Sequence, residues 1–352
     1  MTRRRREGGF TLIELLVATL IFALVFLGVL KLLDSSTRVS KVESALADTQ
    51  ENVRYATYHL VRVCRMAGGT NLPLGWNNSG SVAWVAAEIL DNVSSFTDDA
   101  GVSHTTLAGA DVLKVRGFFE STPYFVLPAN VDLSSGTVKI SEKTPSGKIQ
   151  DFSHLPGQGK GLVLMGRNQY AVAKVSAQPT ISSGTSPNRT MTITFSTGDG
   201  GIWESLNPNG TWTAPTFDVY RVGVLDSYNY FVDPDLQLQR WRASAANSGN
   251  GSVEPVALNI GGLQVAMGMD ADRNGIIAPT EWYYTKDNTS GPPVAAVVGA
   301  PVPSLPMTVL RITVLGRTPF PVRGWQEPVA TFNAEDMPLP SAEARRSKWR
   351  WL

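Results

Sequence analysis

Residues Glu7 to Phe22 read EGGFTLIELLVATLIF, in which two glycines precede an apolar run that contains one acid, Glu14. The run continues to Leu33, and as an α-helix from Phe10 it would measure about 36 Å, enough to cross a hydrocarbon core of ~30 Å. Arg3 to Arg6 precede it, and such basic residues hold their end of a helix in the cytoplasm. The sequence therefore predicts one transmembrane helix with the rest of the chain outside the cytoplasm.

Glu14 is unexpected in a membrane-spanning helix. A carboxylate in lipid costs at least ~2.5 kcal/mol unless it is neutralised or paired. If the chain were cut after Gly9, the new α-amine of Phe10 could face Glu14 of a neighbouring subunit. We therefore interpret Glu14 as a charge that helps to pack helices in a filament.

The segment GFTLIELLVATLIFALV, Gly9 to Val25, resembles the class III signal of type IV pilins and of the pseudopilins of type II secretion. In that family a membrane aspartyl peptidase cuts after the glycine and methylates the new terminal phenylalanine. The resemblance implies processing between Gly9 and Phe10 and an assembly role for Glu14. Major pilins commonly carry a proline about twenty residues into the mature chain, whereas this sequence has Lys31 there. We therefore expect a less interrupted helix, with Gly28 its weak point.

The helix is predicted to continue beyond the membrane. Small or apolar residues recur at three- and four-residue intervals, which is typical of one buried helix face. They are Val39, Val42, Leu46, Thr49, Val53, Ala56, Leu60, Val63 and Ala67. The helix should reach about Met66, where Gly68 and Gly69 follow as a stop signal. The predicted organisation is a leader over 1–9, a transmembrane and filament-core helix over 10–33, an amphipathic continuation over 34–67 and a β-rich body of one or two subdomains over 70–352.

The remainder of the chain has the alternation typical of strands. SYNYFVDPDLQLQRWR predicts a hairpin with a turn at 233–235, after which Leu236 and Leu238 resume the period of two. Similar runs occupy 112–119, 162–175, 190–195, 263–269 and 307–315, and ARRSKWRWL at the end of the chain suggests a final strand. Exposed loops are predicted over 176–188, 243–252 and 286–306. The expected fold class is α+β: a long N-terminal helix packed against a mainly antiparallel β body.

A second, weaker resemblance covers most of the chain. QENVRYATYHLVRVCRMAGG, Gln50 to Gly69, is similar to the helix end of the PilW group of minor pilins. The segments DVLKVRG, GLVLMGRNQYAVAKV, NYFVDPDLQLQRW and MTVLRITVLGR resemble successive strands of that group. Only the likeness at the amino terminus rests on a highly specific motif.

One segment of the body predicts a metal site. DADRNGIIAPTE, Asp270 to Glu281, matches the D-x-[DN]-x-[DN]-G-x₅-E calcium loop at every required position. The ligands would be side chains of Asp270, Asp272 and Asn274, the Ile276 carbonyl, a water near Ala278 and both oxygens of Glu281, with Gly275 at the sharp turn. Both flanks are β-prone, so we expect a calcium loop between strands rather than helices. The alternative is a polar connection in which the same residues only make a turn.

Other chemistries have little support in the sequence. One cysteine, Cys64, excludes an internal disulfide and is expected to be a small packing residue. His59, His104 and His154 lie far apart without a catalytic or zinc motif, and His59 is interpreted as an interface or surface residue. A net charge of +1, with four bases in the leader, gives no reason to expect nucleic-acid binding. We therefore expect that the protein is not an enzyme.

The resemblance implies a minor pilin of a type IV pilus that helps to start assembly or caps the filament tip. Its partners would be prepilin peptidase, the major and minor pilins and the inner-membrane assembly machinery. The protein would reside in the inner membrane before assembly and then in the filament, near its tip. Two alternatives remain open: a minor pseudopilin of a type II secretion system, and a calcium-dependent adhesin mounted on a pilin helix.

Overall fold

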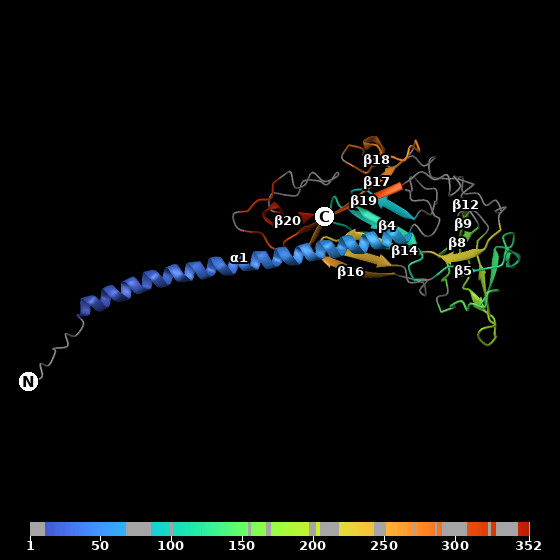
Figure 1. Cartoon of the computed structure of the whole chain (residues 1–352), viewed down its shortest axis with the longest axis horizontal. Helices are drawn as coiled ribbons and strands as arrows, with labels where there is room; N and C mark the ends of the chain where they lie inside the picture. Colours follow the sequence, from blue (N-terminus) through green and yellow to red (C-terminus); the bar gives the residue numbers. More distant parts are fainter. Residues whose placement is uncertain are drawn as a thin grey trace, which may run out of the picture. The chain divides into compact units, whose positions relative to one another are not determined.

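The structure is a computed structural model, and it describes residues 11–67, 86–98, 101–120, 122–153, 156–166, 170–196, 202–204, 218–242, 251–270, 272–285, 287–290, 308–322, 325–328 and 344–351. The chain divides into two compact units, 1–48 and 49–352, which we describe separately. One helix, α1 (Leu12–Ala67), runs through both (Figure 1). It is continuous through Gly28 and ends one residue beyond the predicted position. The stop signal at Gly68 and Gly69 lies outside the described residues.

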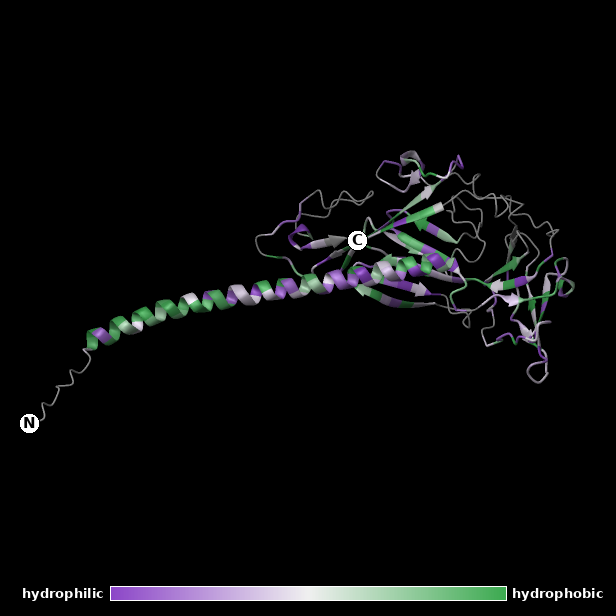
Figure 2. Cartoon of the chain, in the orientation of Figure 1, coloured by the Kyte–Doolittle hydropathy of each residue, from purple (hydrophilic) through white to green (hydrophobic). Residues whose placement is uncertain are grey.

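Helix α1 changes character along its length. Its early part is mostly hydrophobic, whereas hydrophilic residues alternate with hydrophobic ones in its later part (Figure 2). Within residues 49–67, the predicted stripe is buried in the body. Its members there are Thr49, Val53, Ala56, Leu60, Val63 and Ala67, each at most 3% exposed. The amphipathic continuation is therefore confirmed for this part of the helix.

Glycine in two strands lets the helix backbone come close to the sheets. A Cβ atom on Gly316 of β19 (Thr308–Arg317) would lie 2.4 Å from Val53 Cγ2. A Cβ on Gly117 of β4 (Val112–Gly117) would lie 3.2 Å from the Cα of Ala67. Because glycine has no side chain at these positions, residues 49–67 can lie directly on two different sheets.

Two antiparallel sheets form the part of the body that packs on the helix. Sheet I has the order β1-β4-β14-β15-β16 and sheet II the order β18-β17-β19-β20. The strands not yet given are β1 (Ala87–Leu90), β14 (Asp226–Val232), β15 (Gln237–Arg242), β16 (Ser252–Leu258), β17 (Ile260–Met269), β18 (Trp282–Tyr283) and β20 (Trp349–Trp351). Apolar residues of both sheets and of α1 share one core, which we call the helix core. Cys64 packs against it, as predicted, and burial raises the pKa of its thiol to about 12.

The predicted hairpin is β14–β15, with Tyr228 paired to Arg242 and Val232 to Leu238. One detail was wrong. Leu236 does not resume the strand, because it adopts a left-handed backbone with φ 63° and donates its amide to the carbonyl of Asp233. The turn is thus one residue longer than the sequence suggested. The final strand, β20, was correctly predicted, and its Trp349 is buried.

A second pair of sheets surrounds a separate core, which we call the sandwich core. Sheet III has the order β12-β9-β8-β13-β5 and sheet IV the order β10-β11-β7-β6. Their strands are β5 (Tyr124–Phe125), β6 (Val131–Asp132), β7 (Thr137–Ser141), β8 (Gly161–Met165), β9 (Tyr170–Lys174), β10 (Thr180–Ile181), β11 (Thr190–Thr194), β12 (Ile202–Glu204) and β13 (Arg221–Val224). A small hairpin, β2 (Ser95–Thr97) with β3 (Ser103–Thr105), forms its own two-stranded sheet, and its Phe96 packs against Phe231 of β14 and Trp241 of β15.

Two sequence predictions need correction here. The single run predicted over 162–175 is a hairpin of two strands, β8 and β9, because the chain reverses between Met165 and Tyr170. The loop predicted over 176–188 contains β10, which pairs with β11. Neither segment carries a local signal for the strand that pairs with it.

Strand β8 separates the two cores. Leu162 and Leu164 belong to the sandwich core, whereas Val163 and Met165 belong to the helix core. Successive side chains of a strand point to opposite faces, so one buried strand can serve two cores. This explains why β8 is buried at all five positions, without the half-exposed alternation expected of a surface strand.

A buried acid lies where the chain passes from sheet III into sheet I. Asp226 opens β14, directly after β13, and its Oδ2 accepts hydrogen bonds from the amides of Phe119 and Glu120 at 2.8 and 2.9 Å. Burial raises the pKa of Asp226 to about 6, an effect that those two hydrogen bonds and Lys160 oppose and that the charge of Glu120 reinforces. The charged carboxylate is thus held at this junction against a desolvation cost.

Asp226 should give the body a measurable pH dependence. A carboxyl group with a raised pKa binds its proton more tightly in the folded state, so its stabilising contribution is complete below its ordinary pKa and is lost as the pH rises through about 6. An Asp226→Asn variant should therefore show a flatter fall in unfolding free energy between pH 4 and 7 than the parent chain. Urea unfolding of both proteins across that range measures the difference. Parallel curves would contradict the assignment.

Candidate functional site

The processing residues Gly9 and Phe10 lie outside the described part of the chain, which begins at Thr11. Thr11 precedes the first helical residue, and its amide and Oγ1 both donate to Glu14 Oε2 at 2.9 Å. In return Thr11 Oγ1 accepts the amide of Glu14 at 3.3 Å. This reciprocal pair is a capping box, which satisfies donors that a helix start leaves without partners.

The capping box was missed in the sequence, although its signature, T-x-x-E, was legible at Thr11 to Glu14. It adds a second role for the glutamate. A carboxylate in the first helical turn also meets the positive end of the helix dipole. Glu14 therefore has a local reason to sit at the start of an apolar helix, in addition to any charge in a neighbouring subunit.

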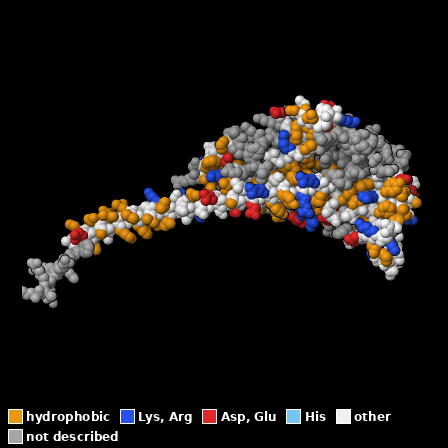
Figure 3. Space-filling model, viewed as in Figure 1, with side chains coloured by type: hydrophobic (Ala, Val, Ile, Leu, Met, Phe, Trp, Pro, Cys, Tyr) orange, Lys and Arg blue, Asp and Glu red, His pale blue; other side chains and the backbone are white. Residues whose placement is uncertain are grey.

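The apolar part of α1 is long enough to cross a membrane, and none of its most hydrophobic stretch is buried inside the protein. Hydrophobic side chains cover this part of the helix in Figure 3. Leu12, Phe22 and Leu32, for example, are at least 69% exposed. Side chains of this kind need lipid or other apolar helices around them.

Three of the predicted calcium ligands, the carboxylates, are brought together. Ligand oxygens of Asp270, Asp272 and Glu281 all lie within 4.8 Å of one another. Asp270 follows β17 directly, and Glu281 ends the short 3₁₀ helix η3 (Pro279–Glu281) before β18. The loop thus joins two paired strands, as the sequence predicted, and not two helices.

Hydrogen bonds shape the loop around Asp270, which is 3% exposed. Its Oδ1 accepts the amide of Asn274 at 3.0 Å and its Oδ2 accepts the amide of Gly275 at 2.8 Å. Burial opposes ionisation, yet these amides and the Asp272 side chain lower the pKa of Asp270. Gly275 turns the chain with φ 83°, a conformation that favours glycine. The loop therefore holds the Asp270 carboxyl group in a fixed turn.

The remaining predicted ligands are less clearly placed for a metal. The Asn274 side chain donates to Asp272 Oδ2 at 2.7 Å and accepts the Ile276 amide at 2.7 Å. Glu281 Oε2 accepts the amide of Ala278 at 2.9 Å. The same hydrogen bonds would form in a plain turn and in a preorganised metal site. They are therefore compatible with both interpretations of the sequence, a calcium loop and a polar connection.

The base of the loop is held firmly. A Cβ atom on Gly268 of β17 would lie 3.0 Å from Ile277 Cγ2, so the loop folds back onto its own strand. The guanidinium of Arg311 lies 4.2 Å from the centre of the Trp282 ring, and Asn288 Nδ2 donates to the Trp282 carbonyl at 3.0 Å. Bound calcium would stiffen a loop whose two ends are already fixed.

Two of the three histidines are described, and they lie in different contacts. His59 Nε2 is 2.9 Å from the Tyr230 hydroxyl, where α1 meets β14. The sequence predicted an interface or surface residue, and the structure shows a half-buried contact between helix and strand within the body. Burial and the charges of Arg240 and Arg62 lower its pKa. His104 pairs with Asp98 at 2.7 Å. His154 lies outside the described residues.

Comparison with known proteins identifies a family motif at the amino terminus. The prokaryotic N-terminal methylation motif matches residues 4–30. No curated protein and no solved structure matches the chain. The motif, followed by one long apolar helix and a β-rich body, makes this a type IV pilin-like protein, that is, a pilin or a pseudopilin. The motif implies cleavage by prepilin peptidase and anchoring in a membrane. Proteins with this motif are structural subunits of filaments.

Proposed function

We propose that the protein is a minor pilin of a type IV pilus, of the PilW kind, which helps to start pilus assembly or caps the filament tip. The observation that carries the proposal is the methylation motif on a continuous 56-residue helix whose last turns are built into a large β body. The protein would reside in the inner membrane before assembly, and the assembly machinery would then incorporate it into a filament with major and minor pilins.

The size of the body supports a terminal position. The described residues within 49–352 carry two large hydrophobic cores and four sheets of four or five strands, far more than is needed to cover one helix. A subunit in the shaft has neighbours above and below, whereas a subunit at the tip leaves one side free for a bulky body. A secretion pseudopilus shares the motif and the helix, and the PilW-like helix end, Gln50 to Gly69, favours the pilus.

Mass spectrometry of sheared, purified pili tests the proposal. A peptide that begins at methylated Phe10, at a small fraction of the major pilin, would support processing and incorporation as a minor subunit. A processed protein that is missing from pili but needed for type II secretion would favour the pseudopilin. A protein found only in membranes with residues 3–9 attached would overturn both.

The two roles of Glu14 can be separated by substitution. Glu14→Gln keeps an oxygen for the Thr11 amide but removes the charge, whereas Thr11→Val removes the hydroxyl of the capping box and keeps the charge. If Glu14 pairs with the terminal amine of a neighbour, Glu14→Gln should be processed normally yet fall at least about tenfold in purified pili. Thr11→Val should stay within about twofold. The reverse order would show that capping is the main role.

We further propose that the Asp270–Glu281 loop binds calcium, with Asp270, Asp272 and Glu281 as carboxylate ligands and Asn274 and the Ile276 carbonyl completing the set. The proximity of the three carboxylates supports it. The ion would be structural, and an adhesive role of the body would depend on it. Deletion of the loop that spares piliation but abolishes attachment would favour the adhesin alternative.

Calcium should stabilise the body measurably. With a Kd near 10⁻⁴ M, 10 mM calcium is about a hundredfold excess and should add ~2.7 kcal/mol to the unfolding free energy. Excess chelator should remove the gain, and Asp272→Asn combined with Glu281→Gln should abolish it. Asp235→Asn, in the exposed β14–β15 turn, is the matched control and should respond like the parent. Equal stability with calcium and with chelator would leave the loop a plain turn.

A further inference from the structure

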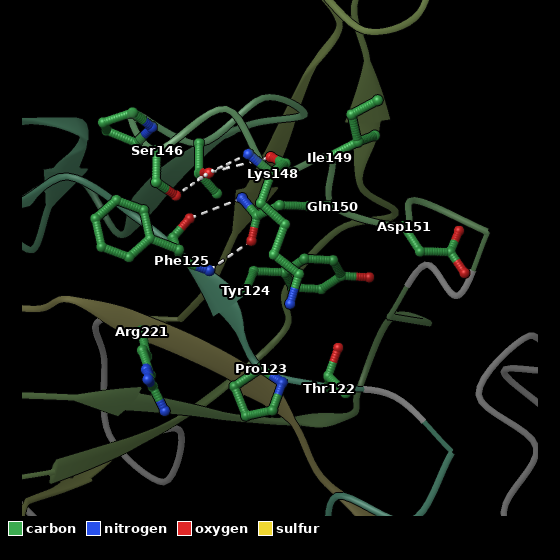
Figure 4. A pocket seen from close by; sticks show the side chains of 12 residues that line it. Thr122, Pro123, Tyr124, Phe125, Ser146, Lys148, Ile149, Gln150, Asp151 and Arg221 are labelled. Carbon is green, nitrogen blue, oxygen red and sulfur yellow. Dashed lines mark hydrogen bonds between the residues drawn. The ribbon is translucent and has the colours of Figure 1, made fainter.

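A pocket lies beside the sandwich core, far along the chain from the calcium loop. Its volume is about 750 Å³, within the usual range for small-molecule sites. One wall is the approach to β5 with β5 itself, another is the turn that follows β7, and Arg221 opens β13 at its side (Figure 4). All of these elements belong to the unit 49–352.

The walls are fixed by hydrogen bonds. The Gln150 side chain pairs with the outer edge of β5: its Oε1 accepts the Phe125 amide at 2.6 Å, and its Nε2 donates to the Phe125 carbonyl at 2.9 Å. The same Nε2 also donates to the Ser141 carbonyl of β7 at 2.9 Å. One side-chain amide thus takes the place of a neighbouring strand and ties sheet III to sheet IV.

The turn that carries the pocket's lysine is equally well defined. Thr144 Oγ1 accepts the amide of Lys148 at 3.0 Å, and the Thr144 amide donates to the Lys148 carbonyl at 2.9 Å. Gly147 has φ 86°, which closes the turn. From it the Lys148 side chain extends toward the part of the pocket lined by Thr122 and Pro123 (Figure 4). The hydrogen-bonded turn therefore fixes the backbone from which the Lys148 amine enters the pocket.

The charges of the pocket favour an anion. Within the described part of the chain, neither Lys148 nor Arg221 forms an ion pair. The one acid of the lining, Asp151, accepts hydrogen bonds from the amide and the hydroxyl of Ser153, both at 2.8 Å. Its oxygens thus take part in a local turn, and with Lys148 and Arg221 set against Asp151 the lining keeps one more positive than negative side chain.

The rest of the lining mixes apolar surface with hydroxyl groups. Pro123, Phe125 and Ile149 offer apolar surface, and Ile149 is 58% exposed. Thr122 adds a hydroxyl beside them. A ligand that fits would carry a carboxylate for the cations, hydroxyls for the polar rim, and C–H faces for the apolar wall. A six-membered acidic sugar has all three.

We infer that this pocket binds an acidic saccharide unit, with its carboxylate attracted by the positive side chains of Lys148 and Arg221 and its ring against Phe125 and Ile149. The inference does not depend on whether the chain is assembled into a pilus or a pseudopilus. It assigns a class of ligand to a body whose proposed role is to start pilus assembly or to cap the filament tip.

Isothermal titration of the full chain in detergent tests the inference, with a galacturonic acid trimer as the probe and a neutral galactose trimer as its uncharged match. Saturable binding of the acidic trimer is expected, with at least about tenfold weaker binding of the neutral one. Lys148→Gln combined with Arg221→Gln should weaken the acidic trimer at least about tenfold. Lys139→Gln is the matched control, because Lys139 is an exposed cation on β7 outside the pocket.

Three outcomes of the titrations would overturn the inference. They are absence of saturable binding, equal affinity for the neutral trimer, and equal affinity in the double variant and the Lys139→Gln control. Competition with inorganic phosphate separates sugar recognition from simple charge. If millimolar phosphate displaced the trimer completely, the pocket would be a general anion site and the saccharide assignment would be wrong. Both substituted cations are exposed, so the variants should fold.

Discussion

A Gly9→Val variant should keep its leader and disappear from filaments, with incorporation falling at least about a hundredfold. Glycine at the cleavage position leaves the backbone open to a protease, whereas a branched side chain obstructs the approach. An uncut chain also keeps Arg3 to Arg6 in front of the apolar helix. Because charged groups are costly in an apolar surrounding, that end could not enter a filament core. The measurement is the N-terminal peptide in membranes and in purified pili.

Gly8→Val is the matched control, since it places the same bulk one residue earlier and off the cleaved bond. It should be processed, with methylated Phe10 detected at no less than about half the parent level. If Gly9→Val were cleaved and methylated like the parent, the assignment of the Gly9–Phe10 bond would be wrong, although the methylation motif over residues 4–30 would stand.

Short-range patterns carried most of what could be predicted. The stripe of Val53, Ala56 and Leu60 predicted a buried helix face because three- and four-residue spacing fixes side-chain direction in any helix. The alternation around Tyr228 and Leu238 predicted a hairpin for the same reason. The calcium-loop spacing correctly placed three carboxylates together, because all of them lie within twelve residues.

Long-range pairing was the part that could not be predicted. Strands β4 and β14 pair although their Asp226 and Gly117 are more than a hundred residues apart. Gln150 acts as a substitute strand for β5, and Gly316 makes room for Val53, yet each looks ordinary in its own stretch of sequence. Their roles depend on partners that local propensity does not name. The pocket beside Lys148 is built from such contacts, so no motif pointed to it.

Leu60→Ala should cost the body about 2 to 5 kcal/mol of unfolding free energy. Leu60 is completely buried where α1 meets the helix core, so the shorter side chain loses apolar contacts and leaves a cavity. Against a typical total of ~5–15 kcal/mol, that loss is a large share. Urea unfolding of the full chain in detergent, followed by tryptophan fluorescence, gives the difference directly.

Tyr58→Ala, two residues away on the same helix, separates folding from assembly. The Tyr58 side chain is 69% exposed, so its truncation should change the unfolding free energy by less than about 0.5 kcal/mol. If this exposed face contacts neighbouring pilins, Tyr58→Ala should lower incorporation into pili while the body stays folded, whereas Leu60→Ala should lower both. An equal loss of stability in the two variants would mean that the Val53–Leu60 stripe is not the only face by which residues 49–67 dock. The face that carries Tyr58 would then have to contact the body as strongly as the face that carries Leu60.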